Sequence, residues 1–238
     1  MWCVDGVVIC PERRWWSSST TLEHSVVDCG GDVVAPGLID LQINGAFGVD
    51  FASPVVRRED VRRAARALLA HGCTAFAPTL VSSTRELYET LLPRYREMML
   101  TWDAGGGSEE ETPCARVLGL HLEGPFLSVA KRGAHLRENV RAPRAASPFE
   151  SVLEHYGGNL RGVRLVTLAP ELEGAVSAIA GLRARGVCVS LGHSRATLLQ
   201  GVAGVRAGAT LLTHLYNTMA PFPSLRRVHF NARSARLS

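Results

Sequence analysis

The sequence predicts an α/β protein whose parallel sheet forms an incomplete (β/α)8 barrel of the TIM type, with about six of the eight βα units. Three segments predict this fold, because each has an amphipathic helix pattern, then a glycine, then a continuous apolar run. The first consists of Glu59–His71, Gly72 and Cys73–Leu80. Glycine suits the left-handed position after a helix, and continuous apolar runs suit strands that are buried on both faces.

The expected strands and helices alternate along the chain. Strands are expected at residues 38–43, 73–80, 117–122, 163–168, 187–191 and 209–213. Helices are expected at residues 59–71, between 84 and 101, around 149–156, and over the apolar patterns of 175–182 and 198–205. A complete barrel usually takes about 250 residues. The series found here lacks two strands.

Three regions are predicted from these patterns. Residues 1–36 hold short β-like pieces and are expected to form a small, partial β appendage. Residues 37–222 are the incomplete barrel, and residues 223–238 form a divergent tail in which both the helix and the strand patterns are lost. Residues 103–112 are glycine-rich and acidic, which is typical of a surface loop.

The composition excludes several classes of function. The net charge is only +4, with Lys and Arg scattered along the chain, so no nucleic-acid partner is expected. No stretch approaches the roughly 20 apolar residues of a membrane span, so no membrane partner is expected. Residues 1–10 lack a basic region and contain Asp5, which argues against a signal peptide. The six cysteines form no CxxC motif, which favours reduced thiols and a cytoplasmic protein.

Polar residues follow three of the expected strands. Glu123 closes the third run, and His193 and His214 follow the fifth and sixth. The carboxyl ends of parallel strands meet at one edge, where barrel enzymes assemble their sites. One carboxylate and two imidazoles are a common zinc set that leaves a position for water. We therefore predict one divalent ion, zinc first, with iron, cobalt and manganese as alternatives. His121 shares the strand face of Glu123 and is expected to support the site.

Five blocks of sequence within residues 26–222 identify the chain more closely: Gly37–Phe51, Gly119–His135, Val163–Glu171, Gly186–Ala196 and Gly208–Phe222. They resemble the N-acetylglucosamine-6-phosphate deacetylase family of the amidohydrolase superfamily. The resemblance implies the same three metal ligands. It also implies substrate contacts at Ala134, His135, Asn217 and Thr218.

The resemblance further implies a site with a single ion. Most amidohydrolases end the first barrel strand with His-x-His, whereas this chain has Gln42 and Asn44 at that place. Amide side chains are weak metal ligands, so both residues are given a supporting, hydrogen-bonding role.

The implied reaction is hydrolysis of the acetamide of N-acetylglucosamine 6-phosphate to glucosamine 6-phosphate and acetate, a step of amino-sugar catabolism, in a homodimer. In the family, an Asp after the last barrel strand is the general base and acid, and a His-His-Arg-x-Pro-Gly block follows Pro-Phe. This chain has Pro223–Arg227 in place of that block and no counterpart of the Asp. We therefore expect a truncated, poorly active form without a catalytic residue of its own. The alternatives are a non-catalytic fragment that binds a full-length subunit, or an amidohydrolase acting on a cyclic amide.

Overall fold

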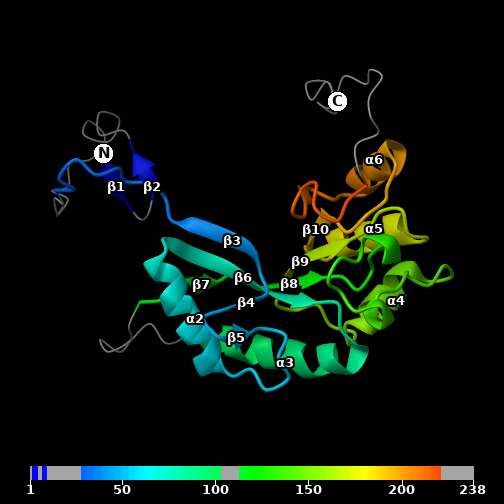
Figure 1. Ribbon diagram of the computed structural model, residues 1–238, viewed down its shortest axis with the longest axis horizontal. Helices are drawn as coiled ribbons and strands as arrows, with labels where there is room; N and C mark the ends of the chain where they lie inside the picture. The colour runs from blue at the N-terminus through cyan, green and yellow to red at the C-terminus, as the bar shows by residue number, and fades with distance from the viewer. Residues whose placement is uncertain (1, 5–6, 10–27, 103–112, 221–238) are drawn as a thin grey trace. The chain divides into compact units, whose positions relative to one another are not determined.

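The computed structural model describes residues 2–4, 7–9, 28–102 and 113–220 of the 238 (Figure 1). The chain divides into two compact units, Met1–Pro36 and Gly37–Ser238. In the first unit, β1 (Trp2–Val4) pairs antiparallel with β2 (Val7–Ile9). The predicted loop at 103–112 and the predicted tail lie outside the described residues, and the three-region division stays a prediction.

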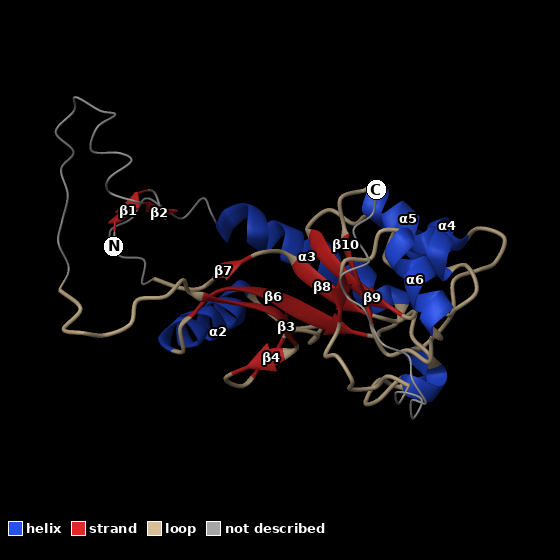
Figure 2. Ribbon diagram, turned by 90° about the horizontal axis from the view of Figure 1, so that it is seen from above, coloured by secondary structure: helices blue, strands red, loops and turns tan. Residues whose placement is uncertain are grey.

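The second unit contains a curled parallel sheet that forms part of a TIM-type barrel (Figures 1 and 2). Its strand order is β11-β10-β9-β8-β6-β3, so neighbouring strands in the sheet succeed one another in the sequence, with the short strands left out of this order. These strands are β3 (Leu38–Ile43), β6 (Cys73–Val81), β8 (Leu120–Glu123), β9 (Val163–Leu168), β10 (Cys188–Leu191) and β11 (Leu211–Leu212). Short β7 (Arg116–Val117) also pairs with β6, and β4 (Gly45–Ala46) pairs with β5 (Val49–Asp50). The predicted fold class is confirmed.

All five expected helices are present. They are α2 (Arg58–Ala70), α3 (Arg85–Trp102), α4 (Pro148–His155), α5 (Ala175–Ala184) and α6 (Leu198–Arg206). In Figure 1 these helices follow the outside of the curled row of strands. Gly72, Gly186 and Gly208 have φ values of 77°, 75° and 115°, which confirms the left-handed stop that was expected after each helix. No helix among the described residues is both long and apolar enough to cross a bilayer.

The core lies between the middle strands and the helices that cover them. Phe76, Leu122, Val166 and Val189, on four adjacent strands, are completely buried. Removing such side chains from water is the main stabilising contribution to a fold of this kind. The same strands end at one edge of the sheet, so this core holds the site residues that follow them.

The two flanks of the sheet depart from the expectation of full burial. On α6, the predicted core residues Leu198 and Val205 are 60% and 53% exposed, and only Gly204 of this helix is buried. Leu212 of β11 and Ile39 of β3 are 56% and 60% exposed. The reason is topological, because β3 and β11 stand at the two ends of the described strand order and each has one neighbour.

Candidate metal centre

The three predicted ligands meet at the carboxyl edge of the sheet. Glu123 is the last residue of β8, while His193 and His214 each follow their strand by two residues. The Oε1 atom of Glu123 lies 3.0 Å from Nε2 of His193 and 3.2 Å from Nε2 of His214. The two Nε2 atoms are 3.1 Å apart. Residues that are 21 to 91 positions apart in sequence thus place three predicted ligand atoms around one point.

The far nitrogens of two histidines are held by backbone carbonyls. His193 Nδ1 lies 2.8 Å from the carbonyl oxygen of Lys131, and His214 Nδ1 lies 3.2 Å from that of Asn217. A carbonyl only accepts, so each Nδ1 carries the proton and donates it. In the neutral rings the Nε2 lone pairs therefore point toward the Glu123 carboxylate. Three acceptors converging in this way suit a bound cation, and the carbonyls supply the outer contacts that orient metal-binding imidazoles.

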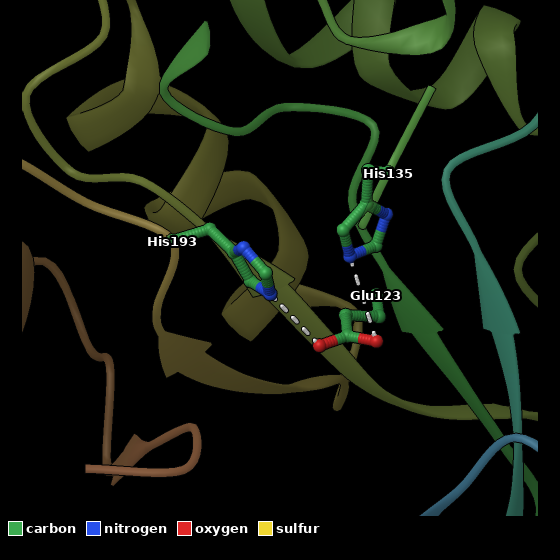
Figure 3. A group of neighbouring side chains, drawn as sticks. All are labelled: Glu123, His135 and His193. Carbon is green, nitrogen blue, oxygen red and sulfur yellow. Dashed lines mark hydrogen bonds and ion pairs between the residues drawn. The ribbon is translucent and has the colours of Figure 1, made fainter. Parts of the chain in front are cut away.

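His135 has the opposite arrangement of its ring nitrogens. Its Nδ1 accepts the backbone N–H of Ser82 at 3.2 Å, so the proton of the neutral ring is on Nε2. That Nε2 lies 3.7 Å from Oε2 of Glu123. Figure 3 shows Glu123, His135 and His193 turned toward one another, and their ligand atoms lie within 4.8 Å. His135 therefore faces the site as a hydrogen-bond donor, whereas His193 and His214 face it as acceptors.

The Glu123 carboxylate is held in its ionised form. Burial of this residue, which is 4% exposed, would by itself raise the carboxyl pKa, but its contacts with His135 and His193 outweigh burial and hold the pKa well below its usual range. Gln42, on β3, donates its side-chain N–H to Oε1 of Glu123 at 2.6 Å. The Gln42 amide thus donates to the same carboxylate oxygen that faces His193 and His214, and its supporting role stays a prediction.

His121 lies in a buried polar layer under the site. Its Nδ1 is 3.0 Å from the carbonyl of Leu41, and its Nε2 is 2.7 Å from Oγ1 of Thr167. Thr167 is 2.7 Å from the hydroxyl of Thr213, which donates to Ser190 at 2.7 Å. Burial lowers the pKa of His121 to about 4, so the ring is neutral. Both of its nitrogens have partners, and the side-chain contacts of this layer link strands β8, β9 and β10.

Several residues at the site have left-handed backbone conformations. His193, His214 and Thr218 have φ values of 49°, 29° and 50°. Such angles cost roughly 1–3 kcal/mol for residues with a side chain, and they cluster at functional sites. The backbone here is held by tertiary contacts, since Ser194 donates its N–H to the carbonyl of Thr218 and accepts one from Ala220.

A cavity of about 550 Å³ opens beside the cluster. It is lined by all the predicted site residues except His121, namely Gln42, Asn44, Glu123, Ala134, His135, His193, His214, Asn217 and Thr218. The sequence analysis missed Ser82, Ser83 and Asn139, which also line it. Asn139 donates its side-chain N–H to the carbonyl of Ser82 at 3.0 Å. The two serines directly follow β6, so the strand-end rule that found the other residues could have found them.

The chain is similar in sequence to several N-acetylglucosamine-6-phosphate deacetylases. The chain is 45% identical over 226 residues to the N-acetylglucosamine-6-phosphate deacetylase of Bos taurus and 44% identical to that of Homo sapiens. Each alignment covers 93% of this chain and 51% of the relative. With the enzyme of Bacillus subtilis the identity is 33% over 190 residues. The chain thus spans about half the length of the curated relatives it matches, and no family model matches it.

Solved structures of N-acetylglucosamine-6-phosphate deacetylases are similar to the chain as well. The chain matches an N-acetyl-D-glucosamine-6-phosphate deacetylase from Mycobacterium smegmatis with a TM-score of 0.63 at 33% identity. It matches the Thermotoga maritima enzyme with a TM-score of 0.65 at 27% identity. Both matches cover 79% of this chain, and they cover 45% and 46% of those structures. A mutant of the M. smegmatis enzyme, also at a TM-score of 0.63, was solved with N-acetyl-D-glucosamine-6-phosphate.

The partial barrel carries a carboxylate and imidazoles at its strand ends, which are the ligand types of metal-dependent hydrolases. Among such hydrolases, the chain is similar in sequence and fold to the N-acetylglucosamine-6-phosphate deacetylases, over about half of their length.

Proposed function

We propose that the chain binds one divalent metal ion through Glu123, His193 and His214 and that its site serves the hydrolysis of N-acetylglucosamine 6-phosphate to glucosamine 6-phosphate and acetate. The observation that carries this proposal is the convergence of Oε1 and two Nε2 atoms within 3.2 Å. One carboxylate and two imidazoles favour zinc, with iron, cobalt and manganese as alternatives. Such an ion, when bound, lowers the pKa of a water molecule toward ~7 and polarises a carbonyl.

The residues around the three ligands would bind and orient the substrate. The Nε2–H of His135 is available to donate to an oxygen of the amino sugar, because its Nδ1 is engaged by Ser82. Gln42 would keep Glu123 in place through its 2.6 Å hydrogen bond. Ala134, Asn217 and Thr218 line the same cavity, and we propose that they contact the sugar phosphate. Asn44 would add hydrogen bonds at the cavity wall.

Proton transfer limits the activity that we propose for this chain alone. Hydrolysis of an amide needs a group that takes a proton from water and gives one to the leaving amine. Among the described residues that line the cavity, Glu123 is the sole carboxylate, and we assign it and the three histidines to metal or substrate binding. We therefore propose low deacetylase activity. The homodimer and the cytoplasmic location also remain proposals, and no observation favours the non-catalytic fragment or the cyclic-amide alternative.

Metal content and acetate release from the full 238-residue chain test this proposal. After zinc loading and gel filtration, the chain should retain one ion per subunit and release acetate from N-acetylglucosamine 6-phosphate slowly. Glu123→Gln should lose both properties. His71→Gln, which changes an exposed histidine on the helix side, should keep them. Metal retention by Glu123→Gln equal to that of the unchanged chain would refute the ligand assignment.

A further inference from the structure

A second and larger cavity, of about 760 Å³, opens at the opposite ends of the strands. It lies where β7 and β9 begin, beside the turn before β10 and the last turn of α3. Because the strands are parallel, this cavity and the candidate metal centre lie at opposite edges of one sheet. Nothing in the proposed reaction uses it.

Arginines dominate the charge of this cavity. Its lining includes Arg96, Arg116, Arg161, Arg164 and Arg185 and no acidic residue. Among the described residues, no carboxylate forms an ion pair with Arg161, Arg164 or Arg185. Arg96 likewise has no such partner there, and its buried Nε has no hydrogen-bond partner in the described part of the chain. The cavity therefore carries several positive charges that the surrounding structure does not neutralise.

Two glycines form part of the cavity wall and allow side chains to approach closely. Gly119 has a φ of 129°, and a Cβ at this position would lie 2.3 Å from Cγ of Arg164. Gly162 has a φ of 88°, and a Cβ there would lie 2.6 Å from the terminal methyl of Met99. A larger residue at either position would thus displace a lining side chain. The shape of the cavity depends on both glycines.

One of the arginines is held in place by its own contacts. The guanidinium carbon of Arg185 lies 4.1 Å from the ring centre of Phe149, a cation–π distance, and its Nη1 donates to the carbonyl of Gly181 at 3.5 Å. Trp102 and Met99 add an apolar wall beside the charged groups. A fixed cation next to an apolar wall is a common design of small-ligand sites, which combine a few placed polar groups with apolar lining.

We propose that this arginine cavity binds a small polyanion, either a phosphorylated or a polycarboxylate metabolite. Guanidinium groups bind phosphate and carboxylate oxygens in bidentate fashion, and an anion between several of them removes their mutual repulsion. The cavity volume falls in the range of small-molecule sites. The proposal does not depend on the deacetylase activity, because none of its residues belongs to the candidate metal centre.

Calorimetric titration of the full chain with pyrophosphate, and in parallel with citrate, tests this proposal at low ionic strength. We expect saturable binding of at least one probe, weakening as salt is added. Because Arg161→Gln/Arg164→Gln removes two charged hydrogen-bond donors, it should weaken binding about tenfold or more. Arg206→Gln changes an exposed arginine outside the cavity and should leave the affinity unchanged. His193→Ala alters the candidate metal centre and not the arginine cavity, so it should also leave the affinity unchanged. That result would exclude the metal centre as the place where the probe binds.

Three results would overturn the proposal. The first is that neither pyrophosphate nor citrate binds. The second is that the double variant binds a probe with the same affinity as the unchanged chain. The third concerns the sequence between Trp102 and Pro113, which contains Glu109, Glu110 and Glu111. If binding appears only when these three residues are changed to Gln, the arginines serve the chain's own acidic segment instead of a metabolite. Circular dichroism of each variant confirms that the fold is kept.

Discussion

The middle and the flanks of the sheet differ in how firmly they hold their residues. In the middle, Glu123 and His193 are 4% and 3% exposed, and the strands beneath them are covered by helices. At the flanks, His214 has a side chain that is 27% exposed, and it follows β11, whose residues are exposed. The candidate metal centre thus takes two ligands from the rigid middle and one from a flank. We infer that the middle fixes the position of the site and that the flank contributes the more adjustable ligand.

The largest expected difference between the two regions is in stability. Phe76→Ala removes a completely buried ring from β6 and should lower the free energy of unfolding by about 3–5 kcal/mol. Leu212→Ala, in β11, removes a side chain that is 56% exposed and should cost less than about 1 kcal/mol. Urea unfolding of the two variants measures both values. Equal losses would show that the flank is packed as firmly as the middle.

Metal affinity should show the next largest effect. Glu123→Gln removes the carboxylate that contacts all three histidines, so zinc affinity should fall by more than about 100-fold. His214→Ala removes the flank ligand and should cause a smaller loss, because Glu123 and His193 keep their mutual geometry. Competition with a fluorescent zinc chelator gives both affinities, and His71→Gln provides the control. A greater loss in His214→Ala than in Glu123→Gln would reverse the assigned roles.

The buried polar layer should make a smaller contribution. Thr167→Val keeps the side-chain shape but leaves His121 and Thr213 without their 2.7 Å partner, which should cost about 1–3 kcal/mol. Thr210→Val, on the exposed flank, is the matched control and should change stability little. Thermal unfolding compares the two. If both valine variants are equally stable, the layer is not a supporting element of the middle strands.

The smallest effect should be a pH dependence that arises from His155. Burial, followed by the charge of Arg141, lowers the pKa of this histidine below 6.5, so the unfolded chain takes up its proton more readily than the folded one. Stability from this residue should be lost as the pH falls below about 6.5, by at most about 1.4 kcal/mol per pH unit. His155→Gln should flatten the fall in melting temperature between about pH 7 and pH 5. If the melting temperature of His155→Gln falls as steeply with pH as that of the unchanged chain, His155 is not the source of the pH dependence.

The sequence predicted the strands well because glycine stops and apolar runs are local signals. The burial of α6 could not be predicted in the same way, since periodicity shows which face of a helix is apolar but not what covers it. The expected apolar stripe of α6 consists of Leu198, Val202 and Val205, yet these three residues are 36–60% exposed.

The residues of the candidate site were predictable from the sequence, but their hydrogen-bonding states were not. Strand ends indicated Glu123, His193 and His214, which the fold brings together. The proton position on His135 was not predictable, because it depends on the backbone N–H of Ser82, 53 residues away. Such contacts are set by tertiary packing, which leaves no pattern in the sequence between the two residues.

The left-handed backbone at His193 and His214 limits which amino acids can replace them, apart from any role in metal binding. A side chain branched at Cβ, such as Val or Ile, clashes with its own backbone at a φ of 49° or 29°, whereas Asn and Asp adopt this region more easily. In a library of all single substitutions selected only for folding, we expect Gly and Asn to be enriched at these two positions. Selection for zinc retention would then favour histidine in spite of the backbone. Comparison of the two selections would separate the residues that this backbone tolerates from the residue that its chemistry requires.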